Sequence, residues 1–272
     1  MRIIVTGGNS GVGRATASVM AAAGHEVVIA CRTLAKGHEA AATMSRDVEI
    51  RELDLADLTS VRKFADTVDS VDVLVNNAGV LGLPLTRTVD GFEAHMGTNH
   101  LGHFALTCLL GDRIRDRVVA VSSTSYITGH LDFDDLNYHQ RKYKPFAAYG
   151  ESKLANLLFV RELVARGKTA YASDPGMTNT AITRGSSVMQ RAGRAISPYL
   201  AQSPADGARS TIQAITTTLP NGTYFSPRGL MHQWGRPKPT TLKSNAVDLA
   251  GARRLWELSA ELTGCEWQEG ST

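Results

Sequence analysis

The sequence predicts an α/β fold in which helices cover both faces of one doubly wound parallel sheet. Three observations lead to this prediction. Strand and helix patterns alternate along the chain, several strands are almost continuously apolar, and a glycine-rich stretch follows the first strand. Such alternation is typical of repeated β-α units, and continuous apolar strands are typical of parallel sheets that are buried on both faces.

The elements follow in order. Strands are predicted at Arg2–Thr6, Glu26–Ala30, Glu49–Glu52, Val71–Val75, Arg117–Val121 and Thr169–Ser173. Helices are predicted to begin near Gly13, Lys36, Asp57, Gly91, Ala147 and Ala205. Frequent Gly, Ser and Pro over 183–205 predicts a long loop that forms one wall of a pocket. The Gly/Pro-rich segment 220–239 gives no clear element. We treat residues 1–272 as one domain with a C-terminal extension that starts at about residue 220.

Composition restricts the functional class. The chain is 43% hydrophobic and 20% charged, as ordinary globular domains are. The formal net charge of +3 comes with no dense Lys/Arg block, so we expect no nucleic-acid partner. Three cysteines that lie far apart in the sequence fit a reducing compartment. No apolar run approaches the ~20 residues of a membrane span. We therefore expect a cytoplasmic protein without a membrane span.

The glycine-rich stretch reads "TGGNSGVG" over residues 6–13, and such loops usually bring the backbone close to a phosphate. A P-loop would need Lys and Ser/Thr after its last glycine, where Arg14 and Ala15 stand, and Ala cannot bind Mg²⁺. The dinucleotide variant T-G-x-x-x-G-x-G fits at every fixed position. The predicted pyrophosphate contacts are Gly7, Asn9, Ser10, Gly11, Val12 and Gly13. The fold is thus predicted to be of the Rossmann type.

The end of the second strand predicts which dinucleotide binds. Enzymes that use NAD place Asp or Glu there to bond the ribose 2′-OH, whereas this chain reads Ala30-Cys31-Arg32-Thr33. Arg32 can bind a 2′-phosphate with two charged hydrogen bonds, and Ser10 and Arg14 are within plausible reach. The alternative is that Arg32 is a solvated charge at a strand end. We expect NADP, with NADPH preferred over NADH.

Polar residues end several predicted strands, where ligands of open α/β sheets bind. These residues are Asp54, the run Asn76-Asn77-Ala78-Gly79, and Ser122 with Ser123. Taken alone, Asp54 could be a helix N-cap and the Asn-Asn-Ala-Gly run a turn. Tyr149 and Lys153 lie four residues apart and share one helix face. That pair alone could be an ordinary surface pair, but an ammonium beside a phenol favours the phenolate and allows proton exchange with an alcohol or ketone.

Taken together and in this order, these motifs resemble the short-chain dehydrogenase/reductase family. The motifs are T-G-x-x-x-G-x-G, Asp54, Asn76-Asn77-Ala78-Gly79, Asn99, Ser123, Tyr149-x-x-x-Lys153 and Asp174-Pro175-Gly176. They cover roughly residues 1–182. The segments "VVIACR", "DGFEAHMGTNHLGHFALT" and "ESKLANLLF" are most similar to the retinol dehydrogenase and protochlorophyllide reductase-like branch, as are "NGTYFSPRG" and "LWELSAELTG" near the C-terminus.

The resemblance implies a role for each matched residue. Tyr149 would be the general acid in reduction and the general base in oxidation. Lys153 would lower the pKa of Tyr149 and bind the nicotinamide ribose. Ser123 would hydrogen-bond the substrate carbonyl, and Asn99 would hold a water that connects Lys153 to solvent. The further cofactor contacts implied are Asp54, Leu55, Asn76, Ala78, Gly79, Pro175, Gly176 and Thr178, with Thr180 a weaker candidate.

The predicted function is an NADP(H)-dependent oxidoreductase that interconverts an alcohol and a carbonyl on a small, apolar substrate. The alternative is a catalytically silent protein that binds NADP(H) as a sensor or scaffold. His95, His100 and His103 are not joined by Cys or carboxylate clusters, so we expect no metal. Many members of the family form homo-oligomers through the helices that correspond to 91–110 and 147–165, which leaves a homo-oligomer open for this chain.

Overall fold

A single eight-stranded sheet organises the chain. The computed structural model describes residues 1–178 and 202–268. The strands are β1 (Arg2–Thr6), β2 (Glu26–Cys31), β3 (Glu49–Glu52), β4 (Val71–Asn76), β5 (Ile114–Val121), β6 (Ala170–Ser173), β7 (Tyr224–Pro227) and β8 (Pro237–Pro239). They lie in the order β3-β2-β1-β4-β5-β6-β7-β8, and only β8 runs antiparallel to its neighbour. The predicted doubly wound α/β fold is confirmed.

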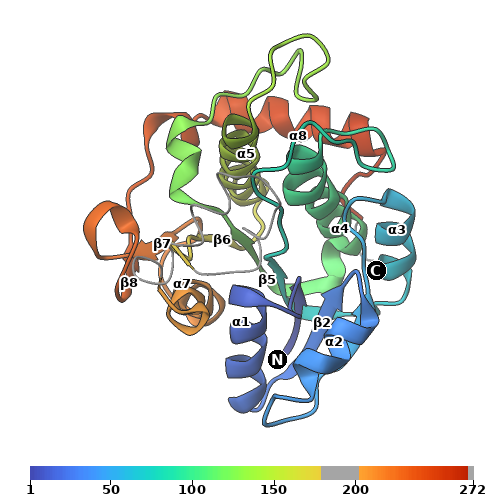
Figure 1. Cartoon of the computed structure of the whole chain (residues 1–272), viewed down its shortest axis with the longest axis vertical. Coiled ribbons are helices and arrows are strands. Elements are labelled where there is room, and N and C mark those ends of the chain that lie inside the picture. Colours follow the sequence, from blue (N-terminus) through green and yellow to red (C-terminus); the bar gives the residue numbers. More distant parts are fainter. Residues whose placement is uncertain (179–201, 269–272) are drawn as a thin grey trace.

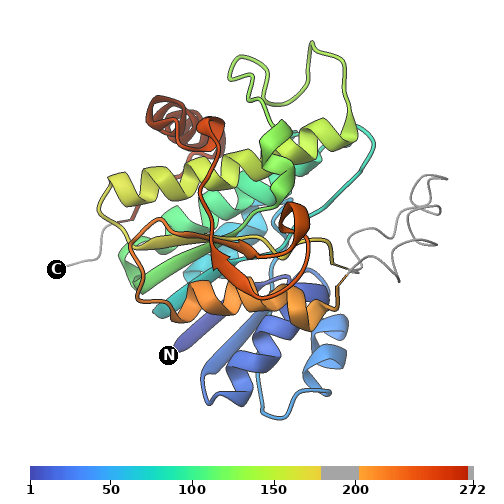
Figure 2. The ribbon, with the colours of Figure 1, turned by 90° about the vertical axis from the view of Figure 1, so that its left-hand side faces the viewer.

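Helices cover both faces of this sheet (Figures 1 and 2). The α-helices are α1 (Gly11–Ala22), α2 (Leu34–Ala41), α3 (Leu58–Asp66), α4 (Gly102–Leu110), α5 (Pro145–Ala165), α7 (Pro204–Thr216) and α8 (Leu249–Thr263). Helices α1, α2 and α7 pack on one face, and α3, α4 and α5 pack on the other, with α8 outside α4 and α5. Short helical turns are η1 (Met96–Leu101), η2 (Gly111–Arg113), η3 (Thr124–Thr128), η5 (Leu230–His232) and η6 (Ser244–Ala246). No helix within the described residues is both long and apolar enough to cross a bilayer.

The apolar strand runs follow from burial on both faces. Along β1, Ile3 and Val5 pack on the α1 and α7 side, and Ile4 packs on the α3 to α5 side. Successive side chains of a strand point to opposite faces, so a sheet covered on both faces needs apolar residues at every position. This requirement makes the central strands visible in the sequence.

One predicted helix begins later than expected. The sequence places its start near Gly91. In the structure, an isolated antiparallel β-bridge pairs Arg87 with Glu93, and Gly91 between them has a φ of +85°. That left-handed conformation cannot belong to a right-handed helix. Helical structure begins at Ala94 and passes through the π-helical turn η1 into α4. Asn99 lies in that turn.

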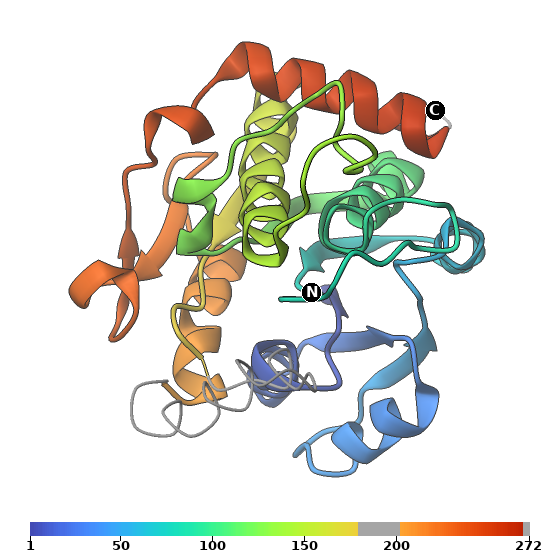
Figure 3. The ribbon, with the colours of Figure 1, turned by 45° about the horizontal axis from the view of Figure 1, so that its top comes forward.

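The C-terminal part of the chain extends the same sheet and covers one of its helical layers. β7 and β8 lie within the segment to which the sequence assigns no element. Helix α8 follows, with the side chain of Asp248 accepting a hydrogen bond from Gly251 N at its start and Gly264 in the left-handed region after its end. It lies across α4 and α5 (Figure 3). Trp256 of α8 stacks on Phe159 with ring centroids 5.8 Å apart.

The two outermost strands differ from the central ones. β3 has four residues, three of which are charged. β8 has three residues, with Pro237 and Pro239 on either side of Lys238. The predicted loop 183–205 lies outside the described residues up to position 201. Its flanks are tied together, since Gln202 N donates to the carbonyl of Met177 at 2.8 Å.

Candidate active site

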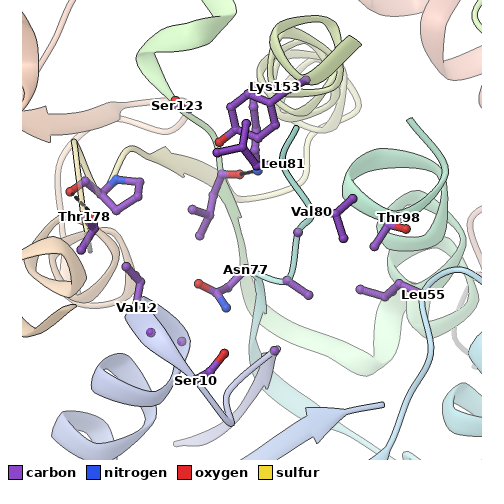
Figure 4. A pocket seen from close by; sticks show the side chains of 18 of the residues that line it. Ser10, Val12, Leu55, Asn77, Val80, Leu81, Thr98, Ser123, Lys153 and Thr178 are labelled. Carbon is purple, nitrogen blue, oxygen red and sulfur yellow. Dashed lines mark hydrogen bonds between the residues drawn. The ribbon is translucent and has the colours of Figure 1, made fainter. Parts of the chain in front are cut away.

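A cleft of about 800 Å³ opens at the carboxyl ends of β1, β2, β4, β5 and β6. Figure 4 shows Ser10 and Val12 on one side of it, Ser123 and Lys153 on the opposite side, and Asn77 between them. Of the predicted site residues, the lining includes Gly7, Asn9, Ser10, Gly11, Val12, Gly13, Arg32, Asp54, Leu55, Ala78, Gly79, Ser123, Tyr149, Lys153, Pro175, Gly176 and Thr178. Residues from seven separate parts of the sequence therefore meet in one cleft.

The glycine loop forms a close-packed floor. A Cβ at Gly13 would lie 2.4 Å from Asn77 Nδ2 and 2.5 Å from the Gly7 carbonyl oxygen. The same Asn77 amide donates to the carbonyl of Thr6 at 2.7 Å. Ser10 is the N-cap of α1 but makes no side-chain cap bond, so its hydroxyl and the first N–H groups of α1 remain for a ligand. This floor fits a pyrophosphate on a helix N-terminus.

Two cations lie where β2 leads into α2. Arg32 is exposed and lines the cleft, and so does Lys36 on the first turn of α2. Within the described part of the chain, neither side chain is engaged in an ion pair. Arg14 differs, because its guanidinium donates to Thr43 Oγ1 and it does not line the cleft. The predicted contribution of Arg14 therefore lacks structural support, and Lys36 is the second cation that lines the cleft with Arg32.

Asp54 follows β3 and lines the cleft beside Leu55. Its Oδ1 accepts a hydrogen bond from Ala56 N at 3.0 Å, which fixes the carboxylate. The N-cap of α3 is Asp57, whose Oδ1 accepts from Thr59 N at 2.8 Å. Asp54 is therefore not a helix cap, and the ligand-facing interpretation of this residue remains.

The two asparagines that follow β4 have different surroundings. Asn77 lines the cleft, whereas Asn76 does not. The side chain of Asn76 is buried and donates to Thr107 Oγ1 of α4 at 2.9 Å. Ala78 and Gly79 line the cleft, and the Thr6 hydroxyl accepts the backbone N–H groups of both Asn77 and Ala78 at 2.9 Å. The predicted contact of Asn76 with the cofactor therefore lacks structural support, because its side chain bonds α4 instead.

Ser123, Tyr149 and Lys153 converge at the inner end of the cleft. Ser123 follows β5, and Tyr149 and Lys153 project from the first half of α5. The Lys153 ammonium donates to the carbonyl of Val121 at 3.0 Å and lies 5.7 Å from the centroid of the Tyr149 ring. The hydroxyl of Ser122 donates to the Lys153 carbonyl at 2.8 Å. Ser122 is occupied in this way, which supports Ser123 as the residue that faces a substrate.

Burial sets the protonation of this group. Burial raises the pKa of Tyr149 to about 12. The hydrogen bond with Ser123 acts to lower this pKa, and the negative charge of Asp174 acts to raise it. Burial also lowers the pKa of Lys153 to about 8, while Asp174 acts to raise it. Without a ligand, the phenol is therefore protonated near neutral pH. The lowering of the Tyr149 pKa by Lys153 that the resemblance implies stays a prediction for the cleft with its cofactor bound.

Asn99 is fully buried behind the cleft, in the π-helical turn η1. Its side chain accepts from Val80 N at 2.7 Å and donates to the carbonyl of Val80 at 3.1 Å and to Ser152 Oγ at 2.9 Å. The backbone carbonyl of Asn99 is hydrogen-bonded to His103 Nδ1 at 2.9 Å. π-turns are frequent at functional sites. Here the turn brings Asn99 against the cleft wall at Val80.

Past β6, Pro175, Gly176 and Thr178 border the cleft. The Thr178 hydroxyl donates to the carbonyl of Pro175 at 3.1 Å, so it closes a small turn. Thr180 lies outside the described residues.

The comparisons with known proteins agree with this geometry. Residues 1–191 match the family model of the short chain dehydrogenases. Retinol dehydrogenase 12 of Mus musculus is 40% identical over 286 residues, which span 98% of this chain and 87% of that protein. Retinol dehydrogenase 13 of Homo sapiens is 40% identical over 289 residues, which span 97% and 85%. The chain belongs to the short-chain dehydrogenase family.

Short-chain dehydrogenases act on alcohol and carbonyl groups with a nicotinamide dinucleotide, and the glycine loop before α1 lines the cleft in which such a ligand would lie. A crystal structure of an uncharacterized protein from Mycobacterium paratuberculosis has the same fold, with 43% identity and a TM-score of 0.84 over 98% of this chain and 95% of that one. The resemblance to the retinol dehydrogenase-like branch is likewise confirmed.

Several cleft residues of this dehydrogenase were missed from sequence. Lys36 lies four residues after Arg32, and a second cation at that spacing was an available signal. The apolar side chains near Tyr149 were not predictable one by one. They are Val80, Leu81, Leu83, Phe146 and Met177.

His100 and His103 are each hydrogen-bonded to a hydroxyl. His100 bonds Ser259 at 2.9 Å, and His103 bonds Thr6 at 2.8 Å. No group of three potential metal ligands occurs among the described residues.

Proposed function

We propose that this short-chain dehydrogenase is an NADP(H)-dependent oxidoreductase of an apolar alcohol or carbonyl compound, with Tyr149 as the general acid and base. The observation that carries this proposal is the convergence of Ser123, Tyr149 and Lys153 at one end of a cleft whose other end is a glycine floor. When bound, the dinucleotide supplies or accepts a hydride.

The chain's own groups position the substrate and manage its proton. The hydroxyls of Ser123 and Tyr149 both face the cleft and can bind one carbonyl oxygen. Tyr149 is protonated near neutral pH, so its phenol can donate to that oxygen as negative charge develops there. The buried Lys153 ammonium, when charged, stabilises the phenolate that remains. Oxidation uses the same groups in reverse.

The substrate side of the cleft is apolar. Phe146 and Met177 are exposed by 55% and 44%, although both line the cleft beside Tyr149. Exposed apolar side chains that are gathered at a pocket favour a ligand that covers them. An apolar carbonyl compound therefore fits better than a sugar or an amino acid. Two of the relatives are named for retinol, and we extend to this chain only the wider class of apolar alcohols and carbonyl compounds.

Preference for NADP(H) rests on Arg32 and Lys36. Both cations border the part of the cleft that follows β2, and no carboxylate stands at the end of that strand. A guanidinium can give a phosphate two charged hydrogen bonds, and an ammonium adds a second positive charge. The three cysteines are free and buried, which suits the cytoplasmic location that we include in the proposal.

Cofactor titration tests this preference. We predict that NADPH binds at least ~10-fold more tightly than NADH, since a charged hydrogen bond contributes ~1.5–3 kcal/mol. Arg32→Ala should remove most of the difference and Lys36→Ala part of it. Arg14→Ala is the matched control, because Arg14 is bonded to Thr43 outside the cleft and should leave the difference intact. All titrations use one ionic strength. Equal affinity of the wild type for both cofactors would show that the NADP assignment is wrong.

A catalytically silent sensor is the second candidate, and activity separates the two. A panel of apolar aldehydes and ketones with NADPH should give turnover by the wild type. Tight NADPH binding without turnover on any of them would favour the sensor.

A further inference from the structure

Asp174 is a buried carboxylate beside the cleft that the roles above do not use. It follows β6 and is 1% exposed. Its Oδ2 accepts hydrogen bonds from the hydroxyls of Thr124 at 2.5 Å and Tyr224 at 3.1 Å. Its Oδ1 accepts from Gly176 N at 2.7 Å. Thr124 is the residue after Ser123, and Gly176 borders the cleft. One carboxylate thus joins the turn that carries Ser123 to the turn that follows β6.

The same carboxylate lies within electrostatic range of the Lys153 ammonium, beyond the 4 Å of a direct ion pair. Strands β5 and β6 pair with Val121 opposite Ser173, and adjacent strands lie ~4.8 Å apart. Lys153 Nζ is bonded to the carbonyl of Val121, and Asp174 is the residue after Ser173. Ser173 bonds Thr211 of α7 on one face, whereas Asp174 bonds Tyr224, which packs on the α5 face. Both charges therefore lie on the α5 side at the ends of neighbouring strands.

Lys153 has no other nearby negative charge among the described residues. Its one hydrogen-bond acceptor is a neutral carbonyl, and its side chain is 3% exposed. The titratable groups that face it are Tyr149 on its own helix, His103 from α4 and Asp174. Burial makes the pKa of His103 about 4, so this histidine is neutral near pH 7. Tyr224 and Tyr126, which face Asp174 from β7 and η3, are neutral phenols with raised pKa values.

We propose that Asp174 is a positioning residue and the counter-ion of Lys153. Its charge keeps the lysine protonated in the ligand-free cleft, and its hydrogen bonds hold the Ser123 turn against the Pro175-Gly176 turn. The functional part of this inference rests on the proposed role of Lys153 in cofactor binding, while the charge pairing itself does not.

Direct titration of Lys153 tests the pairing. Lysine labelled with ¹³C at Cε is followed by NMR from pH 6 to 11, with the Lys153 signal assigned by its loss in Lys153→Met. In the wild type we expect a midpoint near the pKa of about 8. Asp174→Asn keeps the shape and removes the charge, so the midpoint should fall by about one unit, as expected for loss of a close opposite charge. Tyr224→Phe removes a hydrogen bond and keeps the charge, so its midpoint should match the wild type. An unchanged midpoint in Asp174→Asn would overturn the proposal.

Cofactor affinity gives the linked functional readout. NADPH affinity should decrease as pH rises through the Lys153 midpoint, and in Asp174→Asn this decrease should move to lower pH by the same amount. If the wild type does not bind NADPH at any pH, the proposed function fails, but the NMR titration still decides whether Asp174 and Lys153 are paired.

A stability cycle covers the case in which Asp174→Asn does not fold. Removing one of two opposite buried charges leaves the other uncompensated, and removing both relieves this cost. The double variant Lys153→Met/Asp174→Asn should therefore be more stable to urea than the two single effects predict, or should fold where Asp174→Asn alone does not. Additive effects, or failure of both Asp174 variants to fold, would mean that Asp174 serves only the hydrogen-bond framework.

Discussion

The surroundings of Tyr149 determine the protonation state with which it would enter the proposed reaction. Burial raises the pKa of its phenol to about 12, so the proton needed to reduce a carbonyl is present across the neutral range. Oxidation instead requires the phenolate, which a positive neighbour must stabilise. We expect the rate of oxidation, more than that of reduction, to increase with pH.

The first prediction at this scale concerns Tyr149→Phe. The substitution removes only the hydroxyl, and proton transfer by a positioned group contributes ~10²–10⁴-fold. We expect kcat to fall by that range, with NADPH affinity changed by less than about threefold. Stopped assays of carbonyl reduction and a fluorescence titration of NADPH measure the two quantities. A variant that keeps most of its kcat would show that another group handles the proton.

The second prediction concerns Gly13→Ala. The new methyl would lie 2.4 Å from Asn77 Nδ2 and 2.5 Å from the Gly7 carbonyl, so the loop or the Asn77 turn must shift. Overpacking of this kind destabilises by ~1–3 kcal/mol. We expect a loss of NADPH binding together with a lower melting temperature. Ala15→Gly is the control, because it changes helix propensity by a similar energy, ~1 kcal/mol, without filling the floor. Retained binding in Gly13→Ala would show that the loop can relax.

At the scale of elements, α4 and the turn before it are held by buried neutral histidines. The ring of His100 meets Ser259 of α8, and that of His103 bonds Thr6 at the end of β1 and the carbonyl of Asn99. Burial lowers the pKa of His100 to about 3 and that of His103 to about 4. Since the Nδ1–H of His103 must donate to a carbonyl, its Nε2 accepts the Thr6 hydroxyl. The neutral ring therefore sets the orientation of that hydroxyl.

Acid should loosen this element. A histidine whose folded pKa lies below its unfolded value of 6.5 contributes stability above pH 6.5 and loses it as pH falls toward 3 or 4. The expected loss at pH 5 is about 2 kcal/mol for each histidine. Urea unfolding at pH 5 and 7 should show a smaller difference for His103→Gln than for the wild type. His38→Gln, at an exposed position, is the control and should behave as the wild type does. The same pH difference in His103→Gln as in the wild type would exclude this source of acid sensitivity.

Elements differ in how far the sequence reveals them. The run Val71–Val75 is legible because a strand that is buried on both faces must be apolar throughout. The sequence does not predict where the helix after Gly91 begins, because a local β-bridge and the positive φ of Gly91 prevent a helix at residues whose pattern is helical. β8 is hidden because two of its three residues are proline. Motif order identifies Asn99, Tyr149 and Lys153, and the spacing of Lys36 after Arg32 was a signal in the sequence. The π-helical turn that places Asn99 depends on tertiary packing, so the sequence does not predict it.

At the scale of the whole molecule, α8 covers the helices through which a homo-oligomer was considered. Trp256 packs on Phe159 and meets the ring of Phe104 edge-on, with centroids 5.0 Å apart. The Arg166 guanidinium lies over the Trp256 ring, 4.3 Å from the centroid. The outward side of α5 is therefore occupied by the chain's own C-terminal helix. A homo-oligomer through that side would have to displace α8.

The prediction at this scale is a monomer whose stability depends on Trp256. Trp256→Ala should destabilise the protein by ~3–5 kcal/mol, as large-to-small changes at buried aromatic positions do. Deletion of the chain from residue 249 onward should expose α5 and cause self-association. Sedimentation of the wild type and of the truncated chain measures this. A wild-type dimer that persists in Trp256→Ala would show that another surface mediates assembly.

The two short outer strands close the sheet to other chains. The residues on either side of β8 direct their backbone groups toward β7. Arg228 N donates to the carbonyl of Arg236, and Thr240 N donates to the carbonyl of Tyr224. The alternate positions face outward, and these are Pro237 and Pro239, which have no N–H to offer. At the opposite edge, β3 is short and charged. A strand from a second molecule would find too few donors at one edge and too little length at the other, so fibril-type growth from the native sheet is blocked at both ends.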